Sequence, residues 1–288
     1  MRKGLPVCFH EPVFRIWSAR IFKKSACIES SPARVKYATM GFGPVFPMWI
    51  DYEADGTRRL KNPALIVAVS TSVPQYRALY SQAREMGEYM LRKMKFAKLG
   101  TVRTSAFPPE VLVRDNGLST LPECSFYLMR GKRDVILFAG DASPAEEQYE
   151  FAQFLLDKAK DMGVTELYSV GARWAENPLP PEAEPQATGF ATDPTGVSKL
   201  KRHGVKILAD EPAPFFSSMV VAMAKEMGIK GYKLSVDHGE PSPHVRSVAR
   251  LLEILSVMAG FDVDLAELRS KAPPATPPSQ SGSNTIYH

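Results

Sequence analysis

Short, unbroken apolar runs, each followed by a stretch with helical periodicity, constrain this chain more than any other feature of its sequence. The run ALIVAV at 64–69 is rich in branched residues and has no polar interruption. DVILFAGD at 134–141 and VTELYSVGA at 164–172 follow a similar pattern. Strands have this composition when helices cover both faces of their sheet. The sequence therefore predicts buried strands in the interior of a sheet.

The segments between these runs carry helix signals. Over 75–94, apolar residues recur at steps of three and four and form one stripe, which predicts a helix packed on the core; they are Tyr76, Leu79, Tyr80, Ala83, Met86, Met90 and Met94. Ser143 is predicted to cap the next helix, with Pro144 at its first position and Glu146 completing a capping box. Gly163 is predicted to end that helix in the left-handed conformation.

Two further rounds of the pattern follow. GVKILAD at 204–210 precedes a predicted helix at 215–228, and YKLSVD at 232–237 precedes a helix that opens with Ser-Pro and closes at Gly260. Strand–helix alternation over about 200 residues predicts a single α/β domain, in which a mostly parallel sheet has helices on both faces. Between these rounds, the Pro/Glu-rich segment 176–196 is predicted to be a long loop, and loops of that length are usually functional or mobile.

The chain is expected to have three parts. Residues 1–43 form a basic, poorly ordered extension, 44–270 form the α/β domain, and 271–288 form a disordered Pro/Ser-rich tail. The domain is predicted to begin with a strand in PVFPMWIDYE, at the edge of the sheet because of its prolines. The polar tether APPATPPSQSGSNT cannot repay its ordering entropy. It would span about 45 Å when extended and about 20 Å on average as a coil.

The net charge of +5 is concentrated in the extension. Residues 1–40 hold eight Lys or Arg and two acidic residues, which leaves the other 248 residues with 28 basic and 29 acidic side chains. A nucleic-acid-binding protein concentrates positive charge on its working surface. The nearly neutral body therefore argues against nucleic acid as a partner.

The location is predicted to be cytoplasmic, without a membrane partner. No apolar run approaches the roughly 20 residues of a membrane span. The first 24 residues interrupt every apolar run with a charged residue or His, so they contain no secretory signal. Their basic character is compatible with a transit peptide, although we favour an extension translated from an upstream start codon. Cys8, Cys27 and Cys124 have no metal-ligand spacing and fit a reducing compartment.

Polar residues follow the predicted strands at the edge where an open parallel sheet binds ligands. The row contains Ser70, Thr71, Ser72, Asp141, Arg173, Trp174, Asp210, Asp237, His238 and Glu240. Asp141, Arg173, Asp210 and Asp237 are the candidates for a ligand-binding cleft. The alternative, which we favour, is structural: Asp and Ser before helices cap backbone N–H groups, and an Arg balances carboxylates.

No catalytic, cofactor or metal site is predicted. The turn VSTSVPQY after the first buried strand lacks the glycines of a phosphate cradle. No G-x-x-x-x-G-K-[ST] or G-x-S-x-G motif occurs, and the spacing of His238 and His244 matches no helical metal pair. Without a nucleophile–base pair, the sequence gives little support to catalysis.

Four stretches resemble the proteasome assembly chaperone two family. They are NPALIVAVS, DVILFAGDASPAEEQYEFAQFLLDKAKDMGVTELYSVGA, LKRHGVKIL and DHGEPSPHVRSVARLLEILSVMAGFDVDLAEL, and the resemblance covers about 60–270. It implies a fold similar to that of purine nucleoside phosphorylases, without their activity. Many relatives carry a glycine-rich turn where this chain has Ser70-Thr71-Ser72-Val73-Pro74, which argues against an inherited small-molecule site at that turn.

The resemblance also gives a meaning to the last residues, Ile286, Tyr287 and His288. Some members end in hydrophobic–Tyr–any residue, a tail that docks into pockets between α-subunits of the proteasome core particle. Ile286 would supply apolar burial worth about 1.5–3 kcal/mol, Tyr287 a ring and a hydroxyl, and residue 288 a carboxylate. One such tail binds weakly, so we expect a homo-oligomer whose several tails act together.

The leading hypothesis is therefore a non-enzymatic proteasome assembly chaperone, or an adaptor or activator of the core particle. The second is a ligand-binding protein or enzyme, related to nucleosides or phosphate, that uses the cleft at the strand carboxyl ends. The third is an α/β protein whose tail carries no function.

Overall fold

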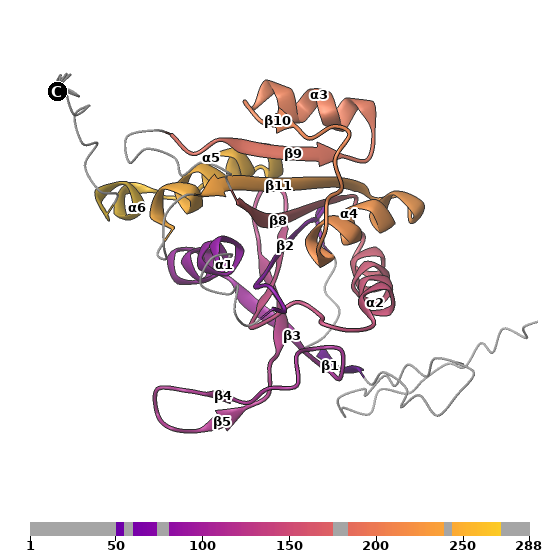
Figure 1. The fold of residues 1–288 in the computed structure, drawn as a ribbon, viewed down its shortest axis with the longest axis vertical. Helices are drawn as coiled ribbons and strands as arrows, with labels where there is room; N and C mark the ends of the chain where they lie inside the picture. The colour runs from indigo at the N-terminus through magenta and orange to yellow at the C-terminus, as the bar shows by residue number, and fades with distance from the viewer. Residues whose placement is uncertain (1–49, 55–59, 74–80, 175–183, 239–243, 272–288) are drawn as a thin grey trace, which may run out of the picture. The chain divides into compact units, whose positions relative to one another are not determined.

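A nine-stranded mixed sheet forms the centre of the protein in the computed structural model, which describes residues 50–54, 60–73, 81–174, 184–238 and 244–271 (Figure 1). The strand order is β1-β3-β6-β7-β2-β8-β11-β9-β10. The strands are β1 Ile50–Ala54, β2 Ala64–Val69, β3 Ala97–Thr104, β6 Cys124–Met129, β7 Val135–Gly140, β8 Glu166–Trp174, β9 Ala187–Ala191, β10 Lys206–Ile207 and β11 Lys230–His238.

The middle of this sheet confirms the predicted architecture. Strands β7, β2, β8 and β11 run parallel to one another, and every residue of β2 is buried. Antiparallel pairs flank them. On one side β6 pairs with β7, β3 with β6 and β1 with β3, and on the other side β9 pairs with β11. The first predicted strand is β1, which lies at the sheet edge as its prolines indicated.

Helices cover both faces of the sheet. They are α1 Gln82–Lys93, α2 Gln148–Asp161, α3 Pro194–Arg202, α4 Phe216–Glu226, α5 Val245–Ala259 and α6 Ala266–Lys271. One core cluster joins α1 and α5 to the sheet, and the other joins α2 and α4 to the opposite face (Figure 1). None of the helices in the described ranges is both long enough and apolar enough to cross a bilayer.

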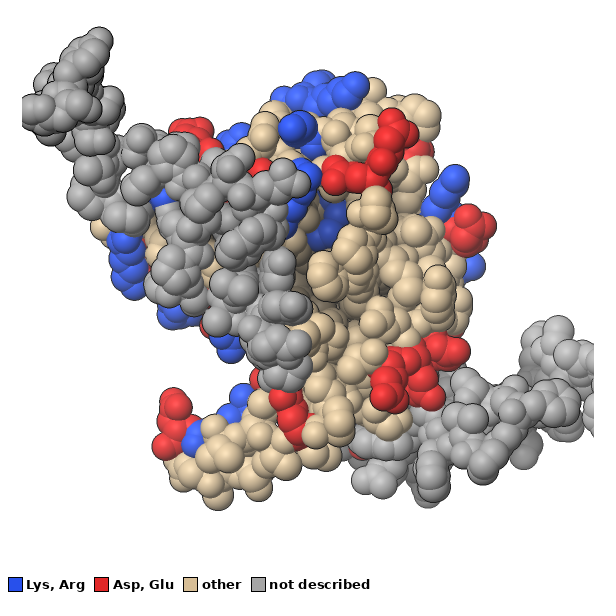
Figure 2. All heavy atoms as spheres, viewed as in Figure 1, with Lys and Arg blue, Asp and Glu red and all other residues tan. Residues whose placement is uncertain are grey.

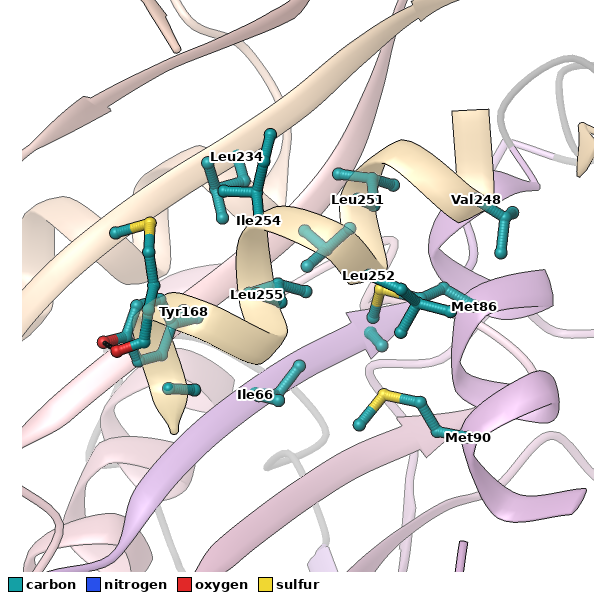
Figure 3. Close-up of a cluster of buried hydrophobic side chains, with 14 of the residues drawn as sticks. Ile66, Met86, Met90, Tyr168, Leu234, Val248, Leu251, Leu252, Ile254 and Leu255 are labelled. Carbon is teal, nitrogen blue, oxygen red and sulfur yellow. Dashed lines mark hydrogen bonds between the residues drawn. The ribbon is translucent and has the colours of Figure 1, made fainter. Parts of the chain in front are cut away.

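The predicted stripe on the first helix is confirmed as core where the structure describes it. Met86 and Met90 are fully buried and point toward Leu252 of α5 and Ile66 of β2 (Figure 3). Ala83 belongs to the same cluster, and Met94 packs against its border. The first part of the stripe, Tyr76, Leu79 and Tyr80, lies outside the described residues.

The predicted capping box of the second helix is wrong, because tertiary hydrogen bonds hold its residues. The N–H of Ser143 donates to Ser70 O at 2.8 Å, and the N–H groups of Ala145 and Glu146 donate to Ala106 O. The helix begins only at Gln148, after Glu147 in the left-handed conformation. The predicted helix ends at Gly163 and Gly260 are confirmed, since both glycines have positive φ.

The predicted loop 176–196 is wrong in its second half. That half contains β9 and the start of α3, whose cap is Asp193: its carboxylate accepts from Gly196 N, with Pro194 at the first helical position. The short, glycine-containing run ATGFA gave too weak a strand signal. The predicted strand 204–210 is confirmed only as β10, which has two residues and runs opposite to the central strands.

A two-stranded arm projects from the sheet (Figure 1). Its strands are β4 Leu112–Val113 and β5 Ser119–Thr120. Four of its large apolar side chains are exposed: Val111, Val113, Leu118 and Leu121. The sequence analysis did not predict this arm, because two-residue strands have no periodicity to detect.

Candidate functional site

The carboxyl ends of the central strands form the edge at which a ligand site was predicted. Ser70 follows β2 and Asp141 follows β7, whereas Arg173 and Asp237 lie near the ends of β8 and β11. Arg173 and Asp237 are partners in the β8–β11 register. Asp210 does not belong to this row, because β10 runs in the opposite direction and leaves Asp210 exposed with a φ of 56°. The side chains of Trp174, His238 and Glu240 lie outside the described residues.

Asp141 serves the projecting arm rather than the cleft. The guanidinium of Arg114 donates to both of its carboxylate oxygens, at 3.2 and 3.0 Å. The same carboxylate accepts the N–H of Glu123 at 3.1 Å, and it raises the pKa of Arg114. These contacts are structural, but they differ from the helix capping expected of Asp141, because they hold Arg114 of the arm and the N–H of Glu123.

Arg173 lines a pocket, and Asp237 is its neighbour on β11. Arg173 donates to Glu211 Oε2 at 3.3 Å. Burial raises the pKa of the Asp237 carboxyl, and the charge of Arg173 opposes that rise. Asp237 Oδ1 has no hydrogen-bond partner among the described groups.

The pocket beside them opens at the start of α4. Its volume is about 130 Å³, and it is lined by residues 172–173, 208, 211–215, 217–218, 233 and 235. A second hollow of about 40 Å³ shares Ala172, Phe215 and Ser217 with it and extends to Ser70 and Ser143. Phe216 fixes the start of the helix by packing against Phe151, with ring centroids 5.7 Å apart. Phe215 before it has a φ of 78°, a strained conformation of the kind that clusters at functional sites.

Lys233 is the residue of this pocket that the sequence analysis missed. It lies in the middle of β11 and is only 4% exposed. Burial lowers the pKa of its amino group to about 7. The signal was present in GYKLSVD, because a lysine is out of place in a strand that helices cover on both faces.

A buried cluster of Ser81, Glu85 and His244 was also missed. Ser81 Oγ donates to Glu85 Oε1 at 2.6 Å and lies 3.1 Å from His244 Nδ1, while Glu85 Oε2 accepts the N–H of His244. The three residue types match a hydrolytic triad. However, Ser81 and His244 are at most 1% exposed, so neither side chain faces solvent in this structure. The cluster joins the starts of α1 and α5, because Glu85 of α1 accepts the N–H of His244, the residue before α5.

The charges of the described surface are mixed. Basic side chains gather over α3, and acidic ones lie beside the start of α2 (Figure 2). Within the described ranges, no group of three or more His, Cys, Asp or Glu residues is arranged to hold a metal ion. Ile286, Tyr287 and His288 lie outside the described residues.

Comparisons with known proteins identify the fold. Residues 83–274 match the model of the PAC2 family. No curated protein sequence matches the chain. The crystal structure of Pyrococcus furiosus PbaB, an archaeal proteasome activator, aligns with a TM-score of 0.65 at 18% identity, covering 77% of this chain and 94% of PbaB.

Two other structures give similar alignments. Pyrococcus furiosus PbaA, an archaeal homolog of proteasome-assembly chaperone, has a TM-score of 0.60 at 20% identity and covers 77% of this chain and 91% of its own. A Mycobacterium tuberculosis proteasome-assembly chaperone homologue has a TM-score of 0.58 at 16% identity, and the alignment covers 72% of this chain and 90% of the homologue. At these identities, the alignments establish a shared fold.

Proposed function

Because the chain belongs to the PAC2 family, we propose that it is a non-enzymatic factor that assists assembly of the proteasome core particle or acts on that particle as an adaptor or activator. The solved structures that share its fold include a proteasome activator and two homologues of proteasome-assembly chaperones, which supports this class of function. The buried position of the Ser81–His244 pair removes the most obvious catalytic candidate.

The residues proposed to contact the core particle are Ile286, Tyr287 and His288. The observation that carries this proposal is a hydrophobic–Tyr–X motif behind a Pro/Ser-rich segment in a chain of this family. In a pocket between α-subunits, Ile286 and Tyr287 would be buried, and the carboxylate of residue 288 would pair with a basic side chain or backbone N–H groups. The proposal requires a free carboxylate on His288, which the intact mass of the protein tests.

Ion pairs and a buried leucine hold α6, the last described helix, against α1 and α5. Glu267 of α6 accepts from Lys93 at 2.6 Å and from Arg92 at 3.1 Å, both in α1. Arg269 of α6 donates to Glu253 of α5 at 2.9 Å, and Leu268 is buried between these contacts. If several copies assemble, tails that leave such anchored helices would act together, which raises the effective concentration of each tail once one has bound.

We also propose that the protein is a homo-oligomer whose projecting arm contacts a second copy. An isolated two-stranded ribbon is marginally stable at best. The arm does not bury its own apolar side chains, since more than half of each of four is exposed: Val111, Val113, Leu118 and Leu121. Burying these side chains against another copy would stabilise the arm and bring several tails to one assembly.

Co-purification with the core particle tests the tail. We expect the full chain to co-purify, and Tyr287→Ala or removal of 286–288 to abolish the association. Asn284→Ala is the matched control, because it changes the same segment outside the motif. Equal recovery of all four proteins would refute docking through these residues.

Sedimentation velocity tests the assembly separately. We expect an oligomer at micromolar concentration, and a shift toward the monomer when Val113 and Leu118 are both replaced by Ser. A wild-type protein that sediments as a monomer at that concentration would contradict the proposed oligomer.

A further inference from the structure

One side of the sheet carries a buried column of polar side chains. In β11, Tyr232, Leu234 and Val236 pack into the core under α5, as strand alternation requires. The alternate residues of β11, Lys233, Ser235 and Asp237, point to the side that α4 covers. Their partners on β8 are Ser169, Gly171 and Arg173. On β9, Thr188 lies opposite Ser235, and the apolar Phe190 lies opposite Lys233. A covered face of an α/β sheet is normally apolar, so this column requires an explanation.

Several polar atoms in this region have no partner. The hydroxyl oxygens of Ser70, Ser169 and Thr188 are buried, and none has a hydrogen-bond partner among the described groups. Ser70 lines the smaller hollow directly. Buried polar atoms are nearly always hydrogen-bonded, so each exception requires an explanation, such as a bound water, ion or ligand.

Lys233 points its amino group toward the same hollows. Its Nζ has one hydrogen bond, at 3.4 Å, to the carbonyl of the adjacent Leu234, and no described carboxylate lies within ion-pair distance of it. A Cβ on Gly171 would collide with this Nζ and would approach Ser217 Oγ to 3.2 Å. Because Gly171 has no side chain, there is room beside it for the amino group of Lys233.

Other hydrogen-bond donors line the space beside this amino group. The start of α4 borders both hollows, and the side chain of Phe215 before it makes no capping hydrogen bond, so the first N–H groups of the helix favour an anion there. The guanidinium of Arg173 lines the larger pocket, together with the hydroxyls of Ser217 and Ser235. The carboxylate of Glu211 is at the rim, already paired with Arg173. The pocket thus offers donors at its floor and an acceptor at its mouth.

We propose that this pocket binds a small hydroxylated molecule through a phosphoryl or carboxyl group that pairs with Lys233 at the start of α4. The anion supplies the counter-charge that the lysine lacks within the described protein. Glu211 at the rim accepts a hydrogen bond from a hydroxyl of the same molecule. The volume of about 130 Å³ is several times that needed for one water. This site is independent of tail docking, so either proposal can fail alone.

The experiment uses the full chain with inorganic phosphate and, separately, acetate, each compared with potassium chloride at equal ionic strength. We expect the unfolding midpoint to rise with anion concentration and to saturate. A response to phosphate but not to acetate indicates a phosphoryl ligand, and a response to acetate but not to phosphate indicates a carboxylate ligand. Losing one charged hydrogen bond should weaken binding about ten- to a hundredfold in Lys233→Met.

Three variants make the result specific. Gly171→Ala displaces the amino group without removing its charge, so it should also lose the saturating response. Lys225→Met removes an exposed lysine of the same α4 and should retain it. The proposal is overturned if neither anion exceeds chloride in wild type, or if Lys233→Met and Gly171→Ala respond as wild type does.

Discussion

Replacing Lys233 by Met should stabilise the free protein. Burial lowers the pKa of this lysine from 10.5 to about 7. Each pKa unit corresponds to about 1.4 kcal/mol, so at pH 7 the folded state loses about 4 kcal/mol by holding the amino group there. Methionine has a similar length and no charge, but it leaves Ser169 and Ser217 beside an apolar side chain. We therefore expect a net gain of about 1–4 kcal/mol in unfolding free energy.

The gain should depend on pH in a defined direction. Between pH 7 and about 10, the unfolded lysine is protonated whereas the folded one is largely neutral, so the unfolded state binds more protons. Wild-type stability should therefore rise with pH across this window, and the difference from Lys233→Met should shrink. Arg173 and Glu211 line the same pocket as Lys233, and Asp237 lies further along β11, but burial alone accounts for the pKa of Lys233.

Urea unfolding at pH 7 and pH 9.5 measures both effects. Lys225→Met is the control, because its exposed side chain should change the unfolding free energy by less than about 0.5 kcal/mol at either pH. A destabilised Lys233→Met protein, with a difference from wild type that does not vary with pH, would refute this reasoning. It would mean that the ammonium is paired in the folded state.

Three further changes test other parts of the structure. Gly140→Ala places a Cβ against the carbonyl of Glu123 and the backbone of Cys124, so we expect urea unfolding to show a loss of at least about 3 kcal/mol in unfolding free energy. The control is Gly117→Ala, which crowds no neighbouring atom and should lose less. Lys271 and Lys93 lower the pKa of Glu267 to about 2, so its stabilisation is present above pH 4.5 and lost toward pH 2. The protection factors of the α6 amides should therefore fall over that range in wild type and be low throughout in Glu267→Gln. Asp141→Asn should release Arg114 and speed amide exchange in the arm, with a global change below about 1 kcal/mol; an unchanged arm would contradict this pairing.

The central fold could be predicted because its signals are local. The run 64–69 and the glycines at 163 and 260 specify buried strands and helix ends through residues adjacent in sequence. The failures have a tertiary cause. The capping box at 143–146 satisfies every local rule, yet the backbone of Ala106 takes two of its N–H groups. No single-sequence pattern reports a bond across forty residues.

The fold brings only some of the predicted candidate residues together. Arg173 and Asp237 do meet at the carboxyl edge, since their parallel strands end together. Asp141 and Asp210 do not join them, because the first pairs with the arm and the second follows a reversed strand. Lys233 was passed over as part of a strand, although its conflict with a buried face was the stronger signal.

The most direct measurement of the proposed function is binding of a peptide ending in SNTIYH to purified proteasome core particles, followed by fluorescence anisotropy. The account predicts saturable binding that the full-length protein competes away and that a peptide ending in SNTIAH does not show. Equal binding of the two peptides, or none by either, would contradict it.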